Sequence, residues 1–240
     1  MKNIPKNTID FLNSNYSINS ISTIKSIRST DGTIKLAFSL FDGHIIEGVL
    51  IPSDDRTTAC ISTQAGCMAA CIFCATGKMG FKRNLLSHEI FEQVFIINEL
   101  SIKEYGHKLN NIVLMGMGEP LLNYEEVIDS IEKITNNSLL AFSPQRITLS
   151  TVGISEKIKQ LADDNLKFNL AVSLHTANHQ KRDKLIPLNR VHNLEKISES
   201  LIYYHKKTGN RITIEYLMIR NFNDKAEDAK ELALFCKSFP

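Results

Sequence analysis

The stretch CISTQAGCMAACIFCATG, residues 60–77, holds four of the five cysteines of the chain. Its three inner cysteines follow the spacing Cys67-x-x-x-Cys71-x-x-Cys74. Thiols stay reduced in the cytoplasm, so clustered cysteines there favour metal or redox chemistry over a disulfide framework. The stretch therefore predicts a metal centre held by a short loop, with one protein ligand fewer than most metal sites use.

Two kinds of metal centre fit this spacing. A [4Fe–4S] cluster is usually held by four cysteines, so three cysteines leave one iron open to an outside ligand. The alternative is a structural zinc site, completed by Cys60 or by a distant histidine, or a set of unrelated buried cysteines. The short intervals favour the open cluster, because one tight loop can then reach three corners of a cube.

Composition and charge indicate an ordinary globular protein. The chain has 240 residues, of which 43% are hydrophobic and 22% charged, enough for one large domain or two small ones. No apolar run reaches the roughly 18 residues of a membrane-spanning helix, and the start MKNIPKNTID lacks the apolar core of a secretory signal. The expected location is the cytoplasm. A net charge of +2 argues neither for nor against nucleic-acid binding.

Strand-like and helix-like segments alternate along most of the chain. Each β-branched run is followed by a segment with helical spacing, which predicts right-handed βαβ units around a parallel sheet. The predicted strands occupy residues 56–63, 111–118, 146–153, 167–175 and 211–219, and the predicted helices begin near Ser87, Asn123, Ser155, Asn193 and Asp224. Asn123 is predicted to cap its helix, and Asp224 with Glu227 to form a capping box.

The chemically unusual residues lie where these predicted strands end. In parallel α/β folds, functional sites gather at the carboxyl ends of the strands. The cysteines follow the first strand, and other polar groups follow the next three. These are Gly118 and Glu119, then Ser150, then Ser173-Leu174-His175. The sequence therefore predicts one site at this edge of the sheet.

Residues 1–55 do not show this alternation of strand-like and helix-like segments. A short helical piece precedes two apolar-alternating runs that are separated by Asp42-Gly43, which is a hairpin signal. We therefore expect a small amino-terminal segment with a β-hairpin over residues 1–55, and a core domain over residues 56–240.

Cys67-x-x-x-Cys71-x-Phe73-Cys74 resembles the signature of radical S-adenosylmethionine (SAM) enzymes, with an aromatic residue before the last cysteine. From about Ile34 onward the chain resembles, more specifically, the RlmN/Cfr family of adenine methyltransferases. The matching stretches are RTTACISTQAGCMAACIFCATGKMGFKRNL, MGMGEPLLNYEEV, ITLSTVG, LAVSLHTAN, RDKLIPLNR and ITIEYLMI.

This resemblance implies an α/β fold, a partial (βα)6 radical-SAM barrel with five βα units present, preceded by a small helix and a β-hairpin. It implies a [4Fe–4S] cluster held by Cys67, Cys71 and Cys74, and SAM as the second cofactor. Gly118 and Glu119 would meet the amino group of SAM. Its ribose and other polar groups would contact Ser150, Ser173, Leu174 and His175.

The resemblance also implies a reaction. Family members methylate C2 or C8 of an adenosine in large-subunit ribosomal RNA, and the C2 enzymes also act on tRNA; we expect C2 here. Glu47 matches the family's proton acceptor by its spacing from Cys60, which matches the cysteine that resolves the protein–RNA adduct. The implied partners are 23S rRNA, tRNA and an electron donor such as flavodoxin or ferredoxin. A monomer without membrane association is expected.

The sequence departs from the family near ELALFCKSFP, residues 231–240. The family's sixth strand, an asparagine that contacts SAM and a methyl-carrying cysteine are not matched, and Cys236 does not align with that cysteine. We therefore expect this chain to bind the cluster and SAM without transferring a methyl group. The alternatives are a radical SAM enzyme for another substrate class and a zinc or RNA-binding remnant without catalysis.

Overall fold

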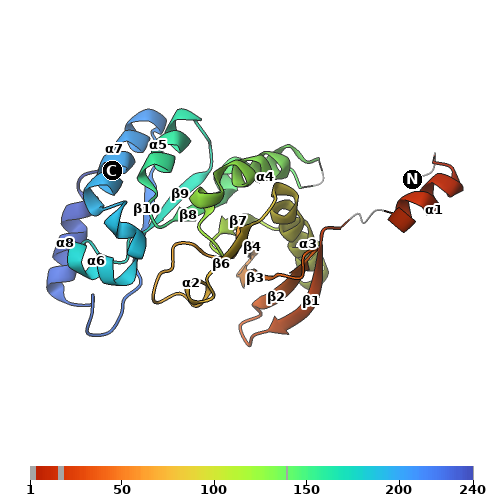
Figure 1. Cartoon of the computed structure of the whole chain (residues 1–240), viewed down its shortest axis with the longest axis horizontal. Helices are drawn as coiled ribbons and strands as arrows, with labels where there is room; N and C mark the ends of the chain where they lie inside the picture. The colour runs from red at the N-terminus through yellow and green to blue at the C-terminus, as the bar shows by residue number, and fades with distance from the viewer. Residues whose placement is uncertain (1–3, 16–18, 139, 240) are drawn as a thin grey trace.

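The computed structural model describes residues 4–15, 19–138 and 140–239, and its main feature is an eight-stranded sheet (Figure 1). The strands lie in the order β1-β2-β3-β4-β7-β8-β9-β10. The first four pair antiparallel, and β4, β7, β8, β9 and β10 pair parallel. Their bounds are β1 Ile21–Arg28, β2 Ile34–Leu40, β3 Ile45–Ser53, β4 Arg56–Cys60, β7 Asn111–Leu114, β8 Ile147–Thr151, β9 Asn169–Ser173 and β10 Ile212–Glu215.

Each parallel strand is followed by at least one helix, which confirms the α/β class and the five predicted βα units. The main helices are α3 Ser87–Tyr105, α4 Tyr124–Asn136, α5 Ser155–Asp163, α7 Leu194–Thr208 and α8 Ala226–Cys236. The shorter ones are α1 Lys6–Asn15, α2 Ala75–Lys78 and α6 His179–Leu185, with 3₁₀ turns at Pro120–Asn123, Pro144–Arg146 and Pro187–Arg190. In the described residues, no helix is both long and apolar enough to cross a bilayer.

The apolar stripes of the helices build the core against one face of the sheet. Ile90, Val94 and Ile97 of α3 are fully buried, as their helical spacing predicts. Ile112 of β7 and Leu149 of β8 lie in the same core. Burial of these side chains leaves the opposite face of the sheet, and the carboxyl ends of its strands, to form the site.

Two of the predicted helix caps differ in the structure. The side chain of Asn123 does not cap α4; its amide instead donates to the carbonyl oxygens of Thr63 and Leu85, both at 2.9 Å. The predicted capping box at Asp224 is also wrong, because α8 begins at Ala226 and Asp228 accepts a 3.2 Å hydrogen bond from the Lys225 amide. Asn123 thus satisfies backbone carbonyls that only the folded chain brings near it, whereas the capping box forms by local contacts one residue later than predicted, at Lys225 and Asp228.

The amino-terminal segment contains the predicted helix, α1, and the predicted hairpin, formed by β2 and β3. It also contains β1, which the sequence analysis missed. Seven of the eight residues of β1 are exposed and its register shifts between Thr23 and Lys25, so the strand carries no regular alternation. The described residues leave out 1–3 and 16–18 of this segment, and 139 and 240 of the core domain. The division of the chain between residues 55 and 56 stays a prediction.

A two-stranded ribbon carries the cysteine loop. It pairs β5 (Gln64–Gly66) with β6 (Phe81–Asn84), so that the loop leaves and re-enters at one place. Arg83 of this ribbon donates to both carboxylate oxygens of the buried Glu89 at 2.7 and 2.8 Å, and it also pairs with Asp42 at the tip of the β2–β3 hairpin. The ribbon is thereby tied to α3 and to the β2–β3 hairpin.

Gly66, where the loop begins, has a φ of 77° and an added Cβ atom would lie 1.8 Å from the carbonyl oxygen of Gly80. We predict that Gly66→Ala lowers the free energy of unfolding by about 1–3 kcal/mol beyond the backbone strain alone, because the ribbon must open. Gly43→Ala is the matched control, since Gly43 has a φ of 82° and nothing lies within 4 Å of its added Cβ. Urea unfolding of both variants checks this, and equal losses would contradict it.

Candidate cofactor site

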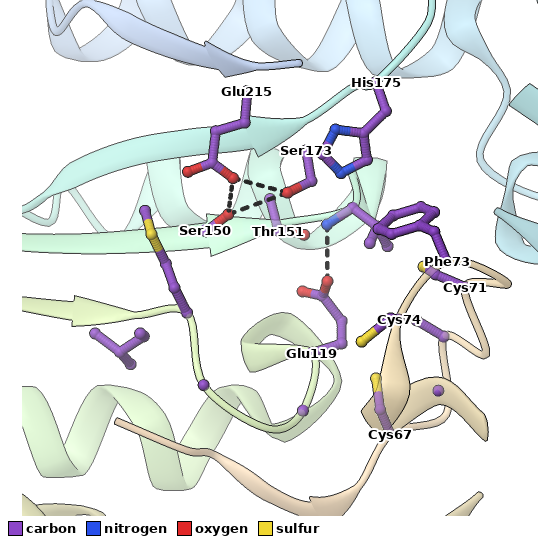
Figure 2. A pocket seen from close by; sticks show the side chains of 17 residues that line it. Cys67, Cys71, Phe73, Cys74, Glu119, Ser150, Thr151, Ser173, His175 and Glu215 are labelled. Atoms are coloured by element: carbon purple, nitrogen blue, oxygen red, sulfur yellow. Dashed lines mark hydrogen bonds between the residues drawn. The ribbon is translucent and has the colours of Figure 1, made fainter. Parts of the chain in front are cut away.

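A cavity of about 210 Å³ lies at the carboxyl ends of the parallel strands (Figure 2). The cysteine loop forms one side of it and the ends of β8, β9 and β10 form the other. Most of the residues predicted from the sequence to serve the cofactors line this one cavity. They are Cys67, Cys71, Cys74, Gly118, Glu119, Ser150, Ser173 and His175.

Burial governs the chemistry of the cysteine loop. It raises the pKa of Cys71 to about 12, with further raising by the neighbouring Cys67 and Cys74, and it also raises the pKa of Cys67. These two thiols are therefore protonated in the metal-free protein, and metal binding must displace their protons. The loop is held in place where the Ile72 amide donates to the Leu185 carbonyl at 3.0 Å.

The arrangement of the thiols fits a cluster better than a single ion. Among residues 4–15, 19–138 and 140–239, no three His, Cys, Asp or Glu side chains converge closely enough to hold one metal ion. A zinc site requires its sulfur ligands at about 2.3 Å from one point. Three cysteines that share a cavity without converging suit the separate corners of an iron–sulfur cluster, and thiolates are the ligands that such clusters use.

Glu119 is the buried acid of the cavity, with 2% of its surface exposed. Burial raises its pKa to about 7, although hydrogen bonds from Val152, Thr151 and Leu121 act in the opposite direction. The Val152 amide donates to Oε2 at 2.8 Å and the Leu121 amide to Oε1 at 3.0 Å. A carboxylate held at this position suits a cationic amine.

Gly118, beside Glu119, leaves room for close approach of the backbone. Its φ is 111°, and an added Cβ would lie 2.7 Å from atoms of Thr63 and Gln64. Only glycine adopts this conformation without strain in so narrow a space.

A second acid, Glu215 at the end of β10, lies beside the two predicted serines. The hydroxyl groups of Ser150 and Ser173 donate to its Oε2 at 2.9 and 2.8 Å (Figure 2). Because each serine hydrogen points to the carboxylate, both serine oxygens present lone pairs to a ligand. The sequence analysis missed Glu215, although it pairs in register with Ser173 and its position at a strand end was the available signal.

His175 enters the cavity as a neutral donor. Burial lowers its pKa to about 4, and its φ of 60° lies in the left-handed region. Its Nδ1 accepts a 3.1 Å hydrogen bond from the Leu217 amide, so the ring hydrogen sits on Nε2. Phe73 packs edge-on against the imidazole with the ring centroids 4.9 Å apart.

Three predicted site residues do not line the cavity. Leu174 is fully buried, and its amide donates to the carbonyls of Val172 and Glu215. Cys60 on β4 is paired with Val49 of β3, and burial raises the pKa of its thiol to about 11. Glu47 lies two residues before Val49, on the same face of the sheet as Cys60, and its carboxylate lies 2.7 Å from Nζ of Lys35. The roles of all three stay predictions.

Comparison with known proteins supports the same chemistry. The Radical SAM superfamily profile matches residues 61–233. Two proteins named "Probable dual-specificity RNA methyltransferase RlmN", from Cytophaga hutchinsonii and Christiangramia forsetii, are 50% and 48% identical to the whole chain, which covers 66% and 68% of them. The crystal structure of a radical SAM methyltransferase from Sphaerobacter thermophilus matches with a TM-score of 0.94 and 38% identity over 99% of this chain and 70% of that one. The chain thus spans about two thirds of the length of these curated relatives.

The raised pKa of Glu119 predicts a pH dependence in the metal-free chain. The folded state keeps the proton up to about pH 7, whereas a glutamate ordinarily releases it near 4.5, so folded stability falls as pH rises between these values and then levels off. Relative to Glu119→Gln, the wild-type free energy of unfolding should fall by on the order of 3 kcal/mol across this range. Urea unfolding at several pH values measures the difference; a difference that does not change with pH would contradict the assignment.

Proposed function

We propose, since the chain belongs to the RlmN family of radical SAM RNA methyltransferases, that its cavity holds a [4Fe–4S] cluster beside S-adenosylmethionine. The observation that carries the proposal is one cavity lined by three cysteines, the buried Glu119 and a serine–glutamate group, which consists of Ser150, Ser173 and Glu215. When bound, the cluster supplies the electron that cleaves the sulfonium of SAM. The protein holds both cofactors and keeps water away from them.

The cysteine loop and Glu119 would both contact the amino-acid part of SAM. Cys67, Cys71 and Cys74 would hold the cluster, and SAM would supply the ligand that the protein does not, through its amino and carboxylate groups. Glu119 accepts hydrogen bonds from the same amino group. A cation beside this carboxylate lowers its raised pKa, so ligand binding makes Glu119 ionise.

The serine–glutamate group suits the ribose of SAM. A ribose diol offers two hydroxyl donors, and Ser150, Ser173 and Glu215 together present acceptor oxygens to the cavity. The Nε2–H of His175 supplies a donor at the same rim for another polar group of the ligand. We therefore add Glu215 to the residues that contact SAM.

For the whole protein we propose methylation of C2 of an adenosine in 23S rRNA and in tRNA. Glu47 would accept the proton that leaves the base, and Cys60 would resolve the protein–RNA adduct. Their position on one face of the sheet supports this pairing. Burial keeps the Cys60 thiol protonated, so it stays unreactive until a base is near. The methyl-carrying cysteine that the family resemblance implies is not among these 240 residues.

The remaining partners follow from this function. One electron must enter for each cleavage, so we propose a low-potential carrier such as flavodoxin or ferredoxin as the donor. RNA and these carriers share the cytoplasm, which we propose as the location of a monomeric enzyme.

We predict that Cys71→Ala abolishes assembly of the cluster, because a ligand that is lost from a three-cysteine set has no replacement in the cavity. After anaerobic reconstitution with iron and sulfide, the variant should be colourless and low in iron, and should release no 5′-deoxyadenosine from SAM under dithionite. Cys236→Ala, on α8, is the control and should keep the brown cluster.

Glu215→Gln should keep the iron but bind SAM about tenfold more weakly, through loss of a charged acceptor.

Two results would contradict this proposal. One is a wild-type chain that takes up stoichiometric zinc and no iron, which would favour the zinc alternative. The other is an iron–sulfur cluster that forms equally well in Cys71→Ala.

We predict that Cys71→Ala in the gene for the whole protein removes 2-methyladenosine from both 23S rRNA and tRNA. Mass spectrometry of nucleosides from cells that carry the wild-type gene, Cys71→Ala or the Cys236→Ala control measures this. Loss of 8-methyladenosine instead would reassign the target carbon. Unchanged RNA in every strain would reject RNA as the substrate.

A further inference from the structure

Arg182 on α6 is a fully buried guanidinium whose partners are all uncharged. Its Nε donates to the Leu174 carbonyl at 3.2 Å. Its Nη2 donates to the carbonyls of Val152 and Ser173 at 2.6 and 3.4 Å, and Nη1 donates to Oδ1 of Asn189 at 2.7 Å. Each acceptor is a neutral oxygen, so the positive charge is solvated by dipoles alone.

A buried charge in this state is costly unless an opposite charge lies nearby. Across the described part of the chain, no carboxylate lies within ion-pair distance of Arg182. The closest link runs through Asn189, whose amide donates at 2.6 Å to Asp183, and Asp183 is exposed to solvent. Burial accordingly lowers the pKa of Arg182 to about 10.

The cysteine loop packs against the carboxyl end of α6 and would supply the missing negative charge when a metal binds. Leu185 and Ile186, just after Arg182, pack against Cys71 in a small apolar cluster. The Ile72 amide donates to the Leu185 carbonyl at 3.0 Å, so this end of α6 supports the loop directly. A thiolate at Cys71 would raise the pKa of Arg182 again.

Arg182 also holds the rim of the cavity. Its carbonyl acceptors belong to Val152, Ser173 and Leu174, at or just beyond the ends of β8 and β9. Val152 in turn donates its amide to Glu119. One guanidinium therefore joins the ends of two strands to the helix that supports the cysteine loop.

We propose that Arg182 is the counter-charge of the metal-bound cysteine loop and raises the reduction potential of its cluster, an inference that rests on the proposed iron–sulfur function. Metal binding converts three thiols to thiolates, and reduction adds one more negative charge. A positive charge held inside a low-dielectric region stabilises the reduced form more than the oxidised form. The hydrogen bonds of Arg182 fix this charge in position.

The test separates the charge of Arg182 from its hydrogen bonds. Arg182→Gln removes the charge, and Arg182→Lys keeps it while losing the planar fork. Lys184→Gln removes an exposed charge from the same helix and is the matched control, because solvent and salt screen it. Each full-length variant is reconstituted anaerobically, checked for folding by circular dichroism and for iron content, and titrated with dithionite under electron paramagnetic resonance.

We expect Arg182→Gln to lower the reduction equilibrium constant by on the order of tenfold, which is about 59 mV toward negative potentials. Arg182→Lys and Lys184→Gln should stay close to wild type. Equal shifts of the reduction potential in the glutamine and lysine variants would show that Arg182 acts through its hydrogen bonds and not through its charge. No shift in either variant would overturn the proposal.

A charge-conserving swap keeps the proposal testable if Arg182→Gln does not fold. The double variant Asn189→Asp with Asp183→Asn moves the exposed carboxylate to a position beside the guanidinium and preserves the donor–acceptor chain. The carboxylate at position 189 would offset the positive charge of Arg182, so the reduction potential should shift in the same direction as in Arg182→Gln. An unchanged potential overturns the proposal. A wild-type chain that assembles no iron–sulfur cluster would instead reject the proposed function.

Discussion

The balance of charge inside one buried cavity is the constraint on which the site depends. The cavity gathers three cysteines and the carboxyl groups of Glu119 and Glu215. In the metal-free protein, burial raises the pKa of Cys67, Cys71 and Glu119, so these three groups hold their protons more strongly. With ligands, iron and the cationic amine of SAM would replace these protons. The site is thus suited to a metal and a cation together.

The parallel sheet provides the place where this balance is achieved. The carboxyl ends of its strands meet at one edge, so residues far apart in sequence, such as Ser150 and Glu215, come within hydrogen-bond distance. Backbone amides then orient the side chains: Val152 orients Glu119, and Leu217 selects the tautomer of His175. The cysteine loop closes over this edge on a separate ribbon, which the ion pair of Arg83 with Glu89 ties to α3.

Predictions from local sequence patterns failed where tertiary contacts outweigh local preferences. Asn123 has the residue type of a helix cap, yet its amide is used to join two loops. The strand β1 is almost wholly exposed, so its residues do not alternate between buried and exposed positions. Its pairing with β2 decides its conformation. In both cases the partner lies far along the chain or depends on a register that a single stretch of sequence does not encode.

Local patterns in the amino-acid sequence were sufficient to assign the class of the protein. Cysteine spacing and the alternation of strands and helices are local patterns, and they were enough to predict the α/β fold, the cysteine loop and eight of the residues that line the cavity. Which groups act on one another depends on the folded arrangement of the chain. Glu215 became a site residue through the register of β10 against β9, and Arg182 became a buried cation through the packing of α6 beneath the cysteine loop. The physical reason is that electrostatic strength depends on distance and burial, and neither is a property of a residue taken alone.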